Sequence, residues 1–221
     1  LTMQDPISGG FTNDVNADGT PGDVMDIPYA CGCGLACLAL GHLPQAQSVH
    51  GFLERIWKSQ YELPERLYYA WSRRNQALIT EVSGPNLWYL VEAQEPRKQR
   101  WTVGGIAAAF LCRLHMVDPD PMYVDLARQY MKFSMESTRR QFDYAQVCKS
   151  GWGASLLYQT TGEVHYRDWG LRVGDWFSDT QRPDGSWAWD SNPTRGQTIE
   201  LTAELVAHID PIIGCLASRI R

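Results

Sequence analysis

The sequence has little positive charge and no long apolar run. Its 221 residues include 20 Lys and Arg against 25 Asp and Glu, which gives a formal net charge of −5. No run of basic residues offsets this balance, so we expect no nucleic-acid partner, because binding to a phosphate backbone depends on clustered positive charge. The longest apolar run, Gly104 to Cys112, is much shorter than the roughly 18 residues of a membrane span, and we expect no such span.

Secretion signals and disulfide patterns are also missing. Residues 1–10 do not combine a basic region with an apolar one, so no signal peptide is visible. Of the six cysteines, Cys31, Cys33 and Cys37 cluster, and their spacing matches neither a C-x-x-C pair nor a dense disulfide framework. We therefore expect reduced thiols, which favours the cytoplasm while leaving the compartment open.

Motifs of several well-known chemistries do not occur. The glycines at 104–105 and 151–153 follow loops instead of strands, so the nucleotide-binding fingerprints do not apply. The five histidines show no H-E-x-x-H or other metal spacing, and no Gly-x-Ser-x-Gly elbow is present. From these absences we expect no cofactor and no metal ligands.

Two segments keep metal binding open as an alternative. Residues 14–19 (DVNADG) begin like a calcium loop, but its twelfth position is Met25 instead of Glu, which favours a polar surface turn. The cysteines at 31, 33 and 37 could bind a soft metal with His42. Because cysteine is readily buried as a small hydrophobe, packing is the favoured interpretation of that group.

Aromatic residues are abundant. The chain contains 9 Trp, 10 Tyr and 6 Phe, which make up 11% of its residues. So many rings in a short chain predict either an aromatic-rich core or a cavity lined by ring faces. With 44% hydrophobic residues, the chain has enough apolar side chains to form a sizeable core.

The hydrophobic pattern predicts a series of helical hairpins. Residues 103–117, 148–161 and 196–207 each begin with small apolar residues typical of a crowded inner helix. The first two are followed by longer amphipathic segments, at 122–136 and 164–180. The repeat length is about 46 residues, which is typical of helical-hairpin repeats. Pro211 is expected to interrupt the chain before a last short helix.

A short motif follows the amphipathic segment that ends at Thr180. Residues 181–187 read QRPDGSW, which resembles the Q-x(2–5)-G-x-W "QW" motif of the terpenoid cyclase and protein prenyltransferase superfamily. A more distant similarity links this turn to α/α-toroid glycan lyases and glycosidases. The resemblance implies an α/α toroid with inner and outer rings of helices. It also implies structural roles, with Gln181 bonded to a neighbouring helix end and Trp187 stacked between hairpins.

The chain departs from that superfamily in its acidic motifs and its length. It contains no D-x-D-D or D-D-x-x-D motif, and Asp118-Pro-Asp-Pro121 is better explained as a helix stop. Six hairpins would need about 275 residues, so we expect an all-α, short or incomplete toroid at residues 29–221. An irregular arm at residues 1–28 precedes it. A homo-oligomer or a partner chain could complete the ring.

Candidate catalytic residues lie at the expected ends of the inner helices. Asp143, Glu200 and Asp26 are the candidate acid–base groups, because an apolar cavity raises the pKa of a carboxyl group into a useful range. Cys148 would begin a helix beside Lys149, and both features favour a thiolate. Tyr144 lies next to these groups. The alternatives are ion-paired carboxylates and a packed cysteine.

The remaining aromatic and basic residues at these ends are candidates for substrate binding. They are Tyr68, Trp71, Trp101, Trp152 and Arg195. The resemblance implies a cofactor-independent cyclase or isomerase that uses acid–base catalysis on an apolar terpenoid, polyene or polyketide-like substrate. One alternative is a glycan-active lyase or hydrolase, whose rings would stack on sugars. Another is a non-catalytic binding module in which the Trp residues only fill the core.

Overall fold

The computed structural model describes residues 3–188 and 193–218. Most of these residues are helical. The helices are α1 (Ile27–Ala39), α2 (Leu43–Lys58), α3 (Val103–Val117), α4 (Pro121–Glu136), α5 (Val147–Thr161), α6 (Val164–Thr180) and α7 (Arg195–Ala217). Two 3-10 segments, η1 (Gly84–Tyr89) and η2 (Arg139–Asp143), precede α3 and α5. In the described residues, no helix is both long and apolar enough to cross a membrane.

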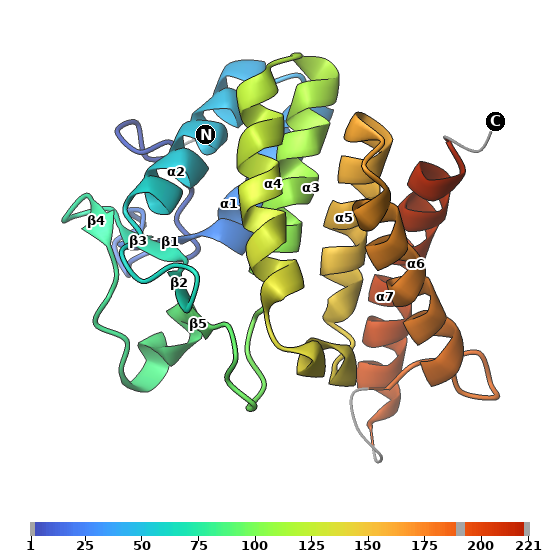
Figure 1. Ribbon diagram of the computed structural model, residues 1–221. Coiled ribbons are helices and arrows are strands. Elements are labelled where there is room, and N and C mark those ends of the chain that lie inside the picture. The colour runs from blue at the N-terminus through green and yellow to red at the C-terminus, as the bar shows by residue number, and fades with distance from the viewer. Residues whose placement is uncertain (1–2, 189–192, 219–221) are drawn as a thin grey trace.

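The helices form an incomplete α/α toroid (Figure 1). The odd-numbered helices pack side by side in the order α1, α3, α5 and α7, and form the inner layer. Helices α2, α4 and α6 each pack against the inner helix that precedes them. The expected fold class, all-α with stacked helical hairpins, is therefore confirmed.

Small residues allow the inner helices to approach closely. A Cβ atom added to Gly105 of α3 would lie 2.6 Å from the carbonyl oxygen of Lys149 in α5. A Cβ atom on Gly153 of α5 would lie 2.3 Å from the carbonyl oxygen of Gly105. Backbone therefore meets backbone where α3 crosses α5, and side chains are excluded from this crossing.

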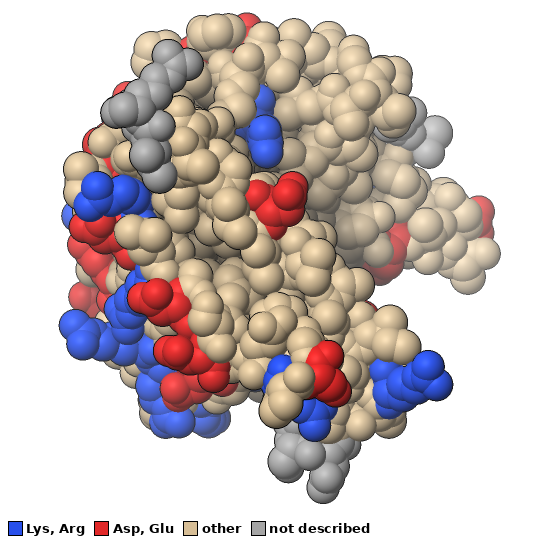
Figure 2. All heavy atoms as spheres, turned by 90° about the vertical axis from the view of Figure 1, so that its right-hand side faces the viewer, with Lys and Arg blue, Asp and Glu red and all other residues tan. Residues whose placement is uncertain are grey.

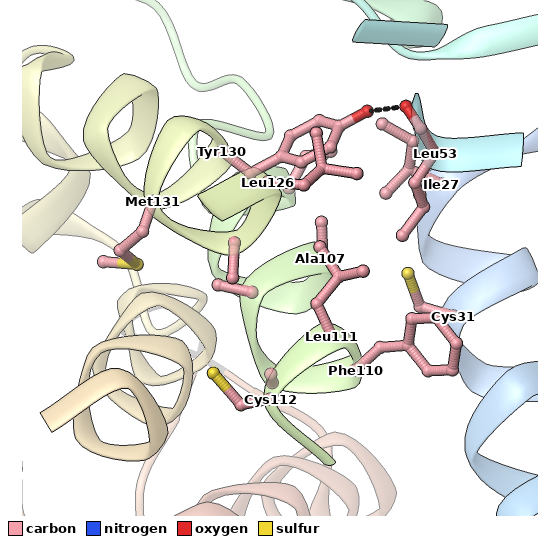
Figure 3. Close-up of a cluster of buried hydrophobic side chains, with 14 of the residues drawn as sticks. Ile27, Cys31, Leu53, Ala107, Phe110, Leu111, Cys112, Leu126, Tyr130 and Met131 are labelled. Carbon is pink, nitrogen blue, oxygen red and sulfur yellow. Dashed lines mark hydrogen bonds between the residues drawn. The ribbon is translucent and has the colours of Figure 1, made fainter. Parts of the chain in front are cut away.

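The core lies between the two helix layers (Figure 3). The residues labelled there from the first three helices and α4 include Ile27, Cys31, Leu53, Phe110, Leu111, Leu126 and Tyr130, all of which are buried. The Tyr130 hydroxyl donates to the carbonyl oxygen of Leu53 at 2.8 Å, which ties α4 to α2. Many of the aromatic residues thus fill the core.

Short strands lie where the sequence shows scarcely any strand signal. Strands β1 (Val24–Asp26), β3 (Ala70–Ser72) and β4 (Ala77–Leu78) form one antiparallel sheet. Strand β2 (Arg66–Tyr68) pairs with β5 (Leu90–Glu92) in a second. Each strand has only two or three residues, which is too few to show an alternating pattern. Because β1 leads directly into α1, the first sheet lies at the N-terminal end of that helix.

The calcium-like segment closes on itself as a polar turn. The Asn16 amide donates to the Thr20 hydroxyl at 2.9 Å and to the carbonyl oxygen of Pro21 at 3.1 Å. The Asp18 carboxylate accepts from the backbone NH and the hydroxyl of Thr20. The segment thus has the hydrogen bonds of a polar surface turn, which is the interpretation that the sequence favours.

Helix α7 differs from the prediction, because it continues through Pro211 as a single helix of 23 residues. A proline inside a helix removes one backbone hydrogen bond and clashes with the preceding turn. Buried Ile212 and Cys215 follow it and anchor the last turns to the rest of the protein. This packing outweighs the local cost of the proline.

One face of α7 is apolar and uncovered. Ile199, Val206 and Ile213 are 58%, 53% and 60% exposed. A shallow groove of about 580 Å³ runs along this face, between Ser186 and the helix. Figure 2 looks onto this side of the molecule, where the centre carries few charged side chains and most of the charge lies along one edge. The inner layer thus has an open edge at α7.

Candidate active site

A cleft of about 340 Å³ lies at the N-terminal ends of three inner helices. Helices α1, α3 and α5 contribute Pro28, Val103, Ile106 and Lys149, and the segments that precede α3 and α5 contribute the rest. Its other lining residues are Trp88, Lys98, Gln99, Arg100, Thr102 and Gln146. The cleft therefore combines one large ring with several hydrogen-bond donors.

The outer part of the cleft is aromatic and cationic. The Trp88 side chain is 56% exposed, and the Arg100 guanidinium lies 5.6 Å from its ring centroid. The Lys98 ammonium lies 5.4 Å from the ring centroid of Tyr144. Such a wall suits a ligand with an apolar face and many oxygen atoms.

Lys149 marks the inner end of the cleft. Its ammonium donates to the Gln146 side chain and forms an ion pair with Glu204 of α7. The side chains of Lys149 and Glu204 are only 22% and 29% exposed. The pair holds a partly buried cation at the point where α5 meets α7.

Cys148 and His208 lie beside Glu204. Single ligand atoms of Cys148, Glu204 and His208 all lie within 4.8 Å of one another. The His208 Nδ1 atom lies 2.8 Å from the backbone carbonyl oxygen of Glu204. A carbonyl oxygen only accepts, so Nδ1 carries the proton and Nε2 keeps its lone pair. The ring of Trp152 packs edge-on against the imidazole with centroids 5.6 Å apart.

The environment of Cys148 disfavours a thiolate, whereas its position in the sequence suggests that a thiolate would be favoured. Burial raises its pKa to about 12, and the Lys149 charge lowers it only in part. Lys149 is paired with Glu204, whose negative charge also raises the thiol pKa. Cys148 is thus a buried, protonated thiol, and a position near a helix start and a lysine does not make it a thiolate.

Asp26 has a structural role at the start of α1. Its carboxylate is buried, accepts from the backbone NH of Tyr29 at 2.8 Å and accepts from the Asn13 amide at 3.1 Å. The first bond is an N-cap, and the second attaches the N-terminal arm to the helix.

We predict that Asp26→Ala lowers the free energy of unfolding by about 2 kcal/mol, because it removes the cap and leaves the partly buried Asn13 amide without this partner. Urea unfolding followed by circular dichroism measures this change. Asp26→Ser is the matched control, since serine retains the capping oxygen. Equal stability of the alanine variant and the wild type would show that the cap contributes nothing.

The other predicted catalytic groups are more exposed. The Asp143 side chain is 54% exposed and pairs with Arg140 at 3.1 Å. Glu200 is exposed on α7, one turn before Glu204. Tyr144 is partly buried, and its ring lies 5.9 Å from that of Trp101. Of the five predicted catalytic residues, only Cys148 belongs to the cluster with Glu204 and His208.

The predicted substrate-binding residues are mostly occupied by packing. Tyr68 is buried, and its hydroxyl donates to Glu62. Trp71 and Trp101 are also buried, and the Trp101 indole donates to the carbonyl oxygen of Glu92 at 3.2 Å. Trp152 is partly buried beside His208, whereas Arg195 is exposed at the start of α7.

Sequence reasoning did not select Trp88, Arg100, Glu204 or His208. Trp88 and Arg100 lie in the irregular segment between β4 and α3, where no periodicity indicates which side chains share a surface. Glu204 and His208 are one helical turn apart, and that spacing is the only signal in the sequence for this pair. Their approach to Cys148 depends on how α7 packs against α5.

The QRPDGSW segment is a structural turn. Gln181 donates to the carbonyl oxygen of Gly185 at 2.9 Å, so it closes its own turn instead of reaching a neighbouring helix end. Trp187 is buried, and its indole donates to the carbonyl oxygen of Phe177 at 3.1 Å. Its backbone NH donates to the Thr202 hydroxyl of α7 at 3.1 Å. Trp187 therefore joins α6 to α7.

In its fold, the chain is similar to several sugar isomerases and epimerases. A D-mannose isomerase matches with a TM-score of 0.66 and 11% identity, over 96% of this chain and 62% of that chain. The cellobiose 2-epimerase from Bacillus thermoamylovorans matches with a TM-score of 0.65 and 11% identity, over 99% and 63%. A sugar epimerase from a ruminal bacterium matches with a TM-score of 0.62 and 13% identity, over 96% and 65%.

These matches show the fold of the chain and the kind of enzyme that shares this fold. The chain spans less than two thirds of the length of each of these structures. No protein-family model and no curated protein matches the sequence. The neighbours are α/α-toroid enzymes that act on sugars, so the toroid expected from the sequence is confirmed. The link to terpenoid cyclases gains no support, because the structures that the chain matches are sugar isomerases and epimerases.

Proposed function

We propose that the chain forms the active site of a sugar isomerase or epimerase. The observation that carries the proposal is the cleft in which exposed Trp88 faces solvent beside Arg100 and Lys149 closes the inner end. An indole face stacks on the apolar face of a sugar ring, and cationic and amide groups bind its hydroxyls. The cationic and amide side chains in its lining, from Lys98 to Arg100 and at Gln146 and Lys149, favour a sugar over the apolar polyene expected from the QW-like motif.

The reaction needs a positive group beside a carbonyl oxygen. Loss of the C2 proton of an open-chain aldose to a base leaves its electron pair to form the C1=C2 bond of an enediolate, and the carbonyl oxygen becomes negative. A proton returned to C2 from the opposite face gives the epimer. A proton returned to C1, with loss of the O2 proton, gives the ketose. A preorganised cation stabilises this transition state, and Lys149, held by Gln146 and Glu204, is proposed for that role.

Deuterium exchange tests the proposal across a range of candidate sugars. The protein is incubated in D2O with a panel of aldohexoses, ketohexoses and β-linked disaccharides. The proton signal that enediolate formation would remove, on C2 of an aldose or C1 of a ketose, is followed by NMR. We expect one class of sugar to lose this signal only when the protein is present, with the epimer or ketose appearing by chromatography. Unchanged spectra for the whole panel, from folded protein, would contradict the proposal.

We predict that Trp88→Ala raises KM for that sugar about fivefold to tenfold, because it removes the ring on which the sugar stacks. The kcat should change little, since Trp88 lies at the outer end of the cleft, away from Lys149. Trp88→Phe is the matched control and should retain most of the affinity. A Trp88→Ala variant with wild-type KM would place the substrate elsewhere.

A further inference from the structure

Three potential metal ligands converge where α5 meets α7. Cys148 is the second residue of α5, and Glu204 and His208 lie one turn apart in the middle of α7. Their ligand atoms all lie within 4.8 Å of one another, and Cys148 is buried while the other two are partly buried. The three side chains thus offer a sulfur, an oxygen and a nitrogen atom around one point.

The hydrogen bonds around this point leave the ligand atoms available. Because His208 Nδ1 bonds to the backbone carbonyl oxygen of Glu204, the Nε2 lone pair is the one free for a ligand. Histidines that bind metals commonly hold their second ring nitrogen in this way. Lys149 binds Oε1 of Glu204, so Oε2 is left for a ligand and the carboxylate is held in place.

The donor set indicates which ion would be bound. A thiolate, an imidazole and a carboxylate suit Zn²⁺, which binds sulfur at about 2.3 Å and nitrogen or oxygen at about 2.0–2.2 Å. Tetrahedral bonds of these lengths place ligand atoms about 3.3–3.8 Å apart, so small side-chain rotations would close the present spacing. Mg²⁺ and Ca²⁺ prefer oxygen ligands and fit the set poorly.

We propose that Cys148, Glu204 and His208 form a three-ligand site for a divalent ion of the Zn²⁺ class. Three protein ligands leave the fourth position of a tetrahedral ion open, which is typical of zinc ions that act on substrates. The site adjoins Lys149, and through it the inner end of the cleft. On binding, the ion replaces the thiol proton, which passes to solvent. The site does not depend on the sugar chemistry proposed above.

The sequence conceals such a site because its ligands come from different hairpins. Metal motifs are recognised from short spacings, whereas Cys148 is more than fifty residues from Glu204. The only local signal is the i, i+4 pair formed by Glu204 and His208. The expectation of no metal ligands rested on short spacings alone.

Cobalt titration tests the site directly. The chelator-treated full chain is titrated with Co²⁺, whose bonding to a thiolate gives a charge-transfer band and whose tetrahedral geometry gives strong visible absorption. We expect one equivalent to bind, Zn²⁺ to displace it, and Cys148→Ser to lose the charge-transfer band. His208→Ala should weaken binding about 100-fold. Cys215→Ser is the matched control, because Cys215 is also a buried cysteine but lies on α7, outside the cluster.

X-ray absorption of the wild-type zinc complex keeps the test valid if a variant does not fold. We expect one sulfur neighbour at about 2.3 Å with nitrogen or oxygen neighbours at about 2.0 Å. Binding well below one equivalent, or a shell without sulfur, would overturn the proposal. Because these measurements contain no sugar, they can fail while the exchange assay succeeds, and the reverse also holds.

Discussion

Gly153→Ala is expected to lower the free energy of unfolding by about 3 kcal/mol, a large part of the stability of a typical domain. The added Cβ atom would lie 2.3 Å from the carbonyl oxygen of Gly105 and 2.8 Å from its Cα atom. These are backbone atoms, so no side-chain rotation can relieve the overlap. The central pair of inner helices, α3 and α5, would have to move apart.

Urea unfolding measures this loss, and Gly174→Ala is the matched control. Gly174 is also helical, on α6, but nothing lies within 4 Å of the position its Cβ atom would take. There the substitution should stabilise the protein by about 0.5–1 kcal/mol, because alanine loses less backbone entropy on folding. Similar effects at both positions would show that the close contact of α3 and α5 does not limit stability.

Lys149→Met is expected to reduce kcat for the sugar reaction by about 100-fold to 1,000-fold with little change in KM. The ammonium would act mainly on charge that develops in the transition state, so substrate affinity should change less than the rate. Steady-state kinetics on the sugar found by deuterium exchange measures both constants. Lys149→Arg retains the charge and should keep more of the activity than the methionine variant.

A matched control separates catalysis from the loss of an ion pair. Lys132 on α4 is exposed and forms an ion pair with Glu136 at 3.8 Å, so Lys132→Met removes a cation away from the cleft. That variant should keep its activity. Since Lys149→Met also leaves Glu204 unpaired, its melting temperature must be measured in parallel. Full activity in a folded Lys149→Met protein would exclude the proposed role.

Glu200 and Glu204 show where the site predicted from the sequence differs from the site in the structure. Both lie on α7, and the sequence favours Glu200 because its neighbours are apolar. In the structure Glu200 is exposed, whereas Glu204 pairs with Lys149. Which of the two glutamates faces α5 depends on the rotation of α7 about its own axis. The 3.6-residue pattern does not predict this rotation, because apolar residues occur on all sides of α7.

More of the architecture than of the candidate site could be predicted from the sequence. The small residues that begin α3 and α5 predict inner helices, because close backbone contacts require glycine or serine at those positions. The amphipathic patterns of α4 and α6 predict their outer positions. The short strands and the segment from Trp88 to Arg100 have no such pattern, and long-range packing determines their structure.

The uncovered face of α7 has a consequence for how the molecule responds to heat. The stability of a hairpin array is approximately the sum of the stabilities of its units and of the interfaces between neighbours. A unit with a neighbour on only one side therefore opens at a lower free energy than a unit with neighbours on both sides. Helix α7 packs mainly on α5, with fewer contacts to α6, while α3 and α5 are enclosed by helices on both sides. Its amide hydrogens should therefore exchange faster than those of α3. Since Glu204 belongs to α7, partial opening would separate it from Lys149 before the core unfolds. Loss of the proposed sugar activity on warming should therefore precede the loss of helical circular dichroism.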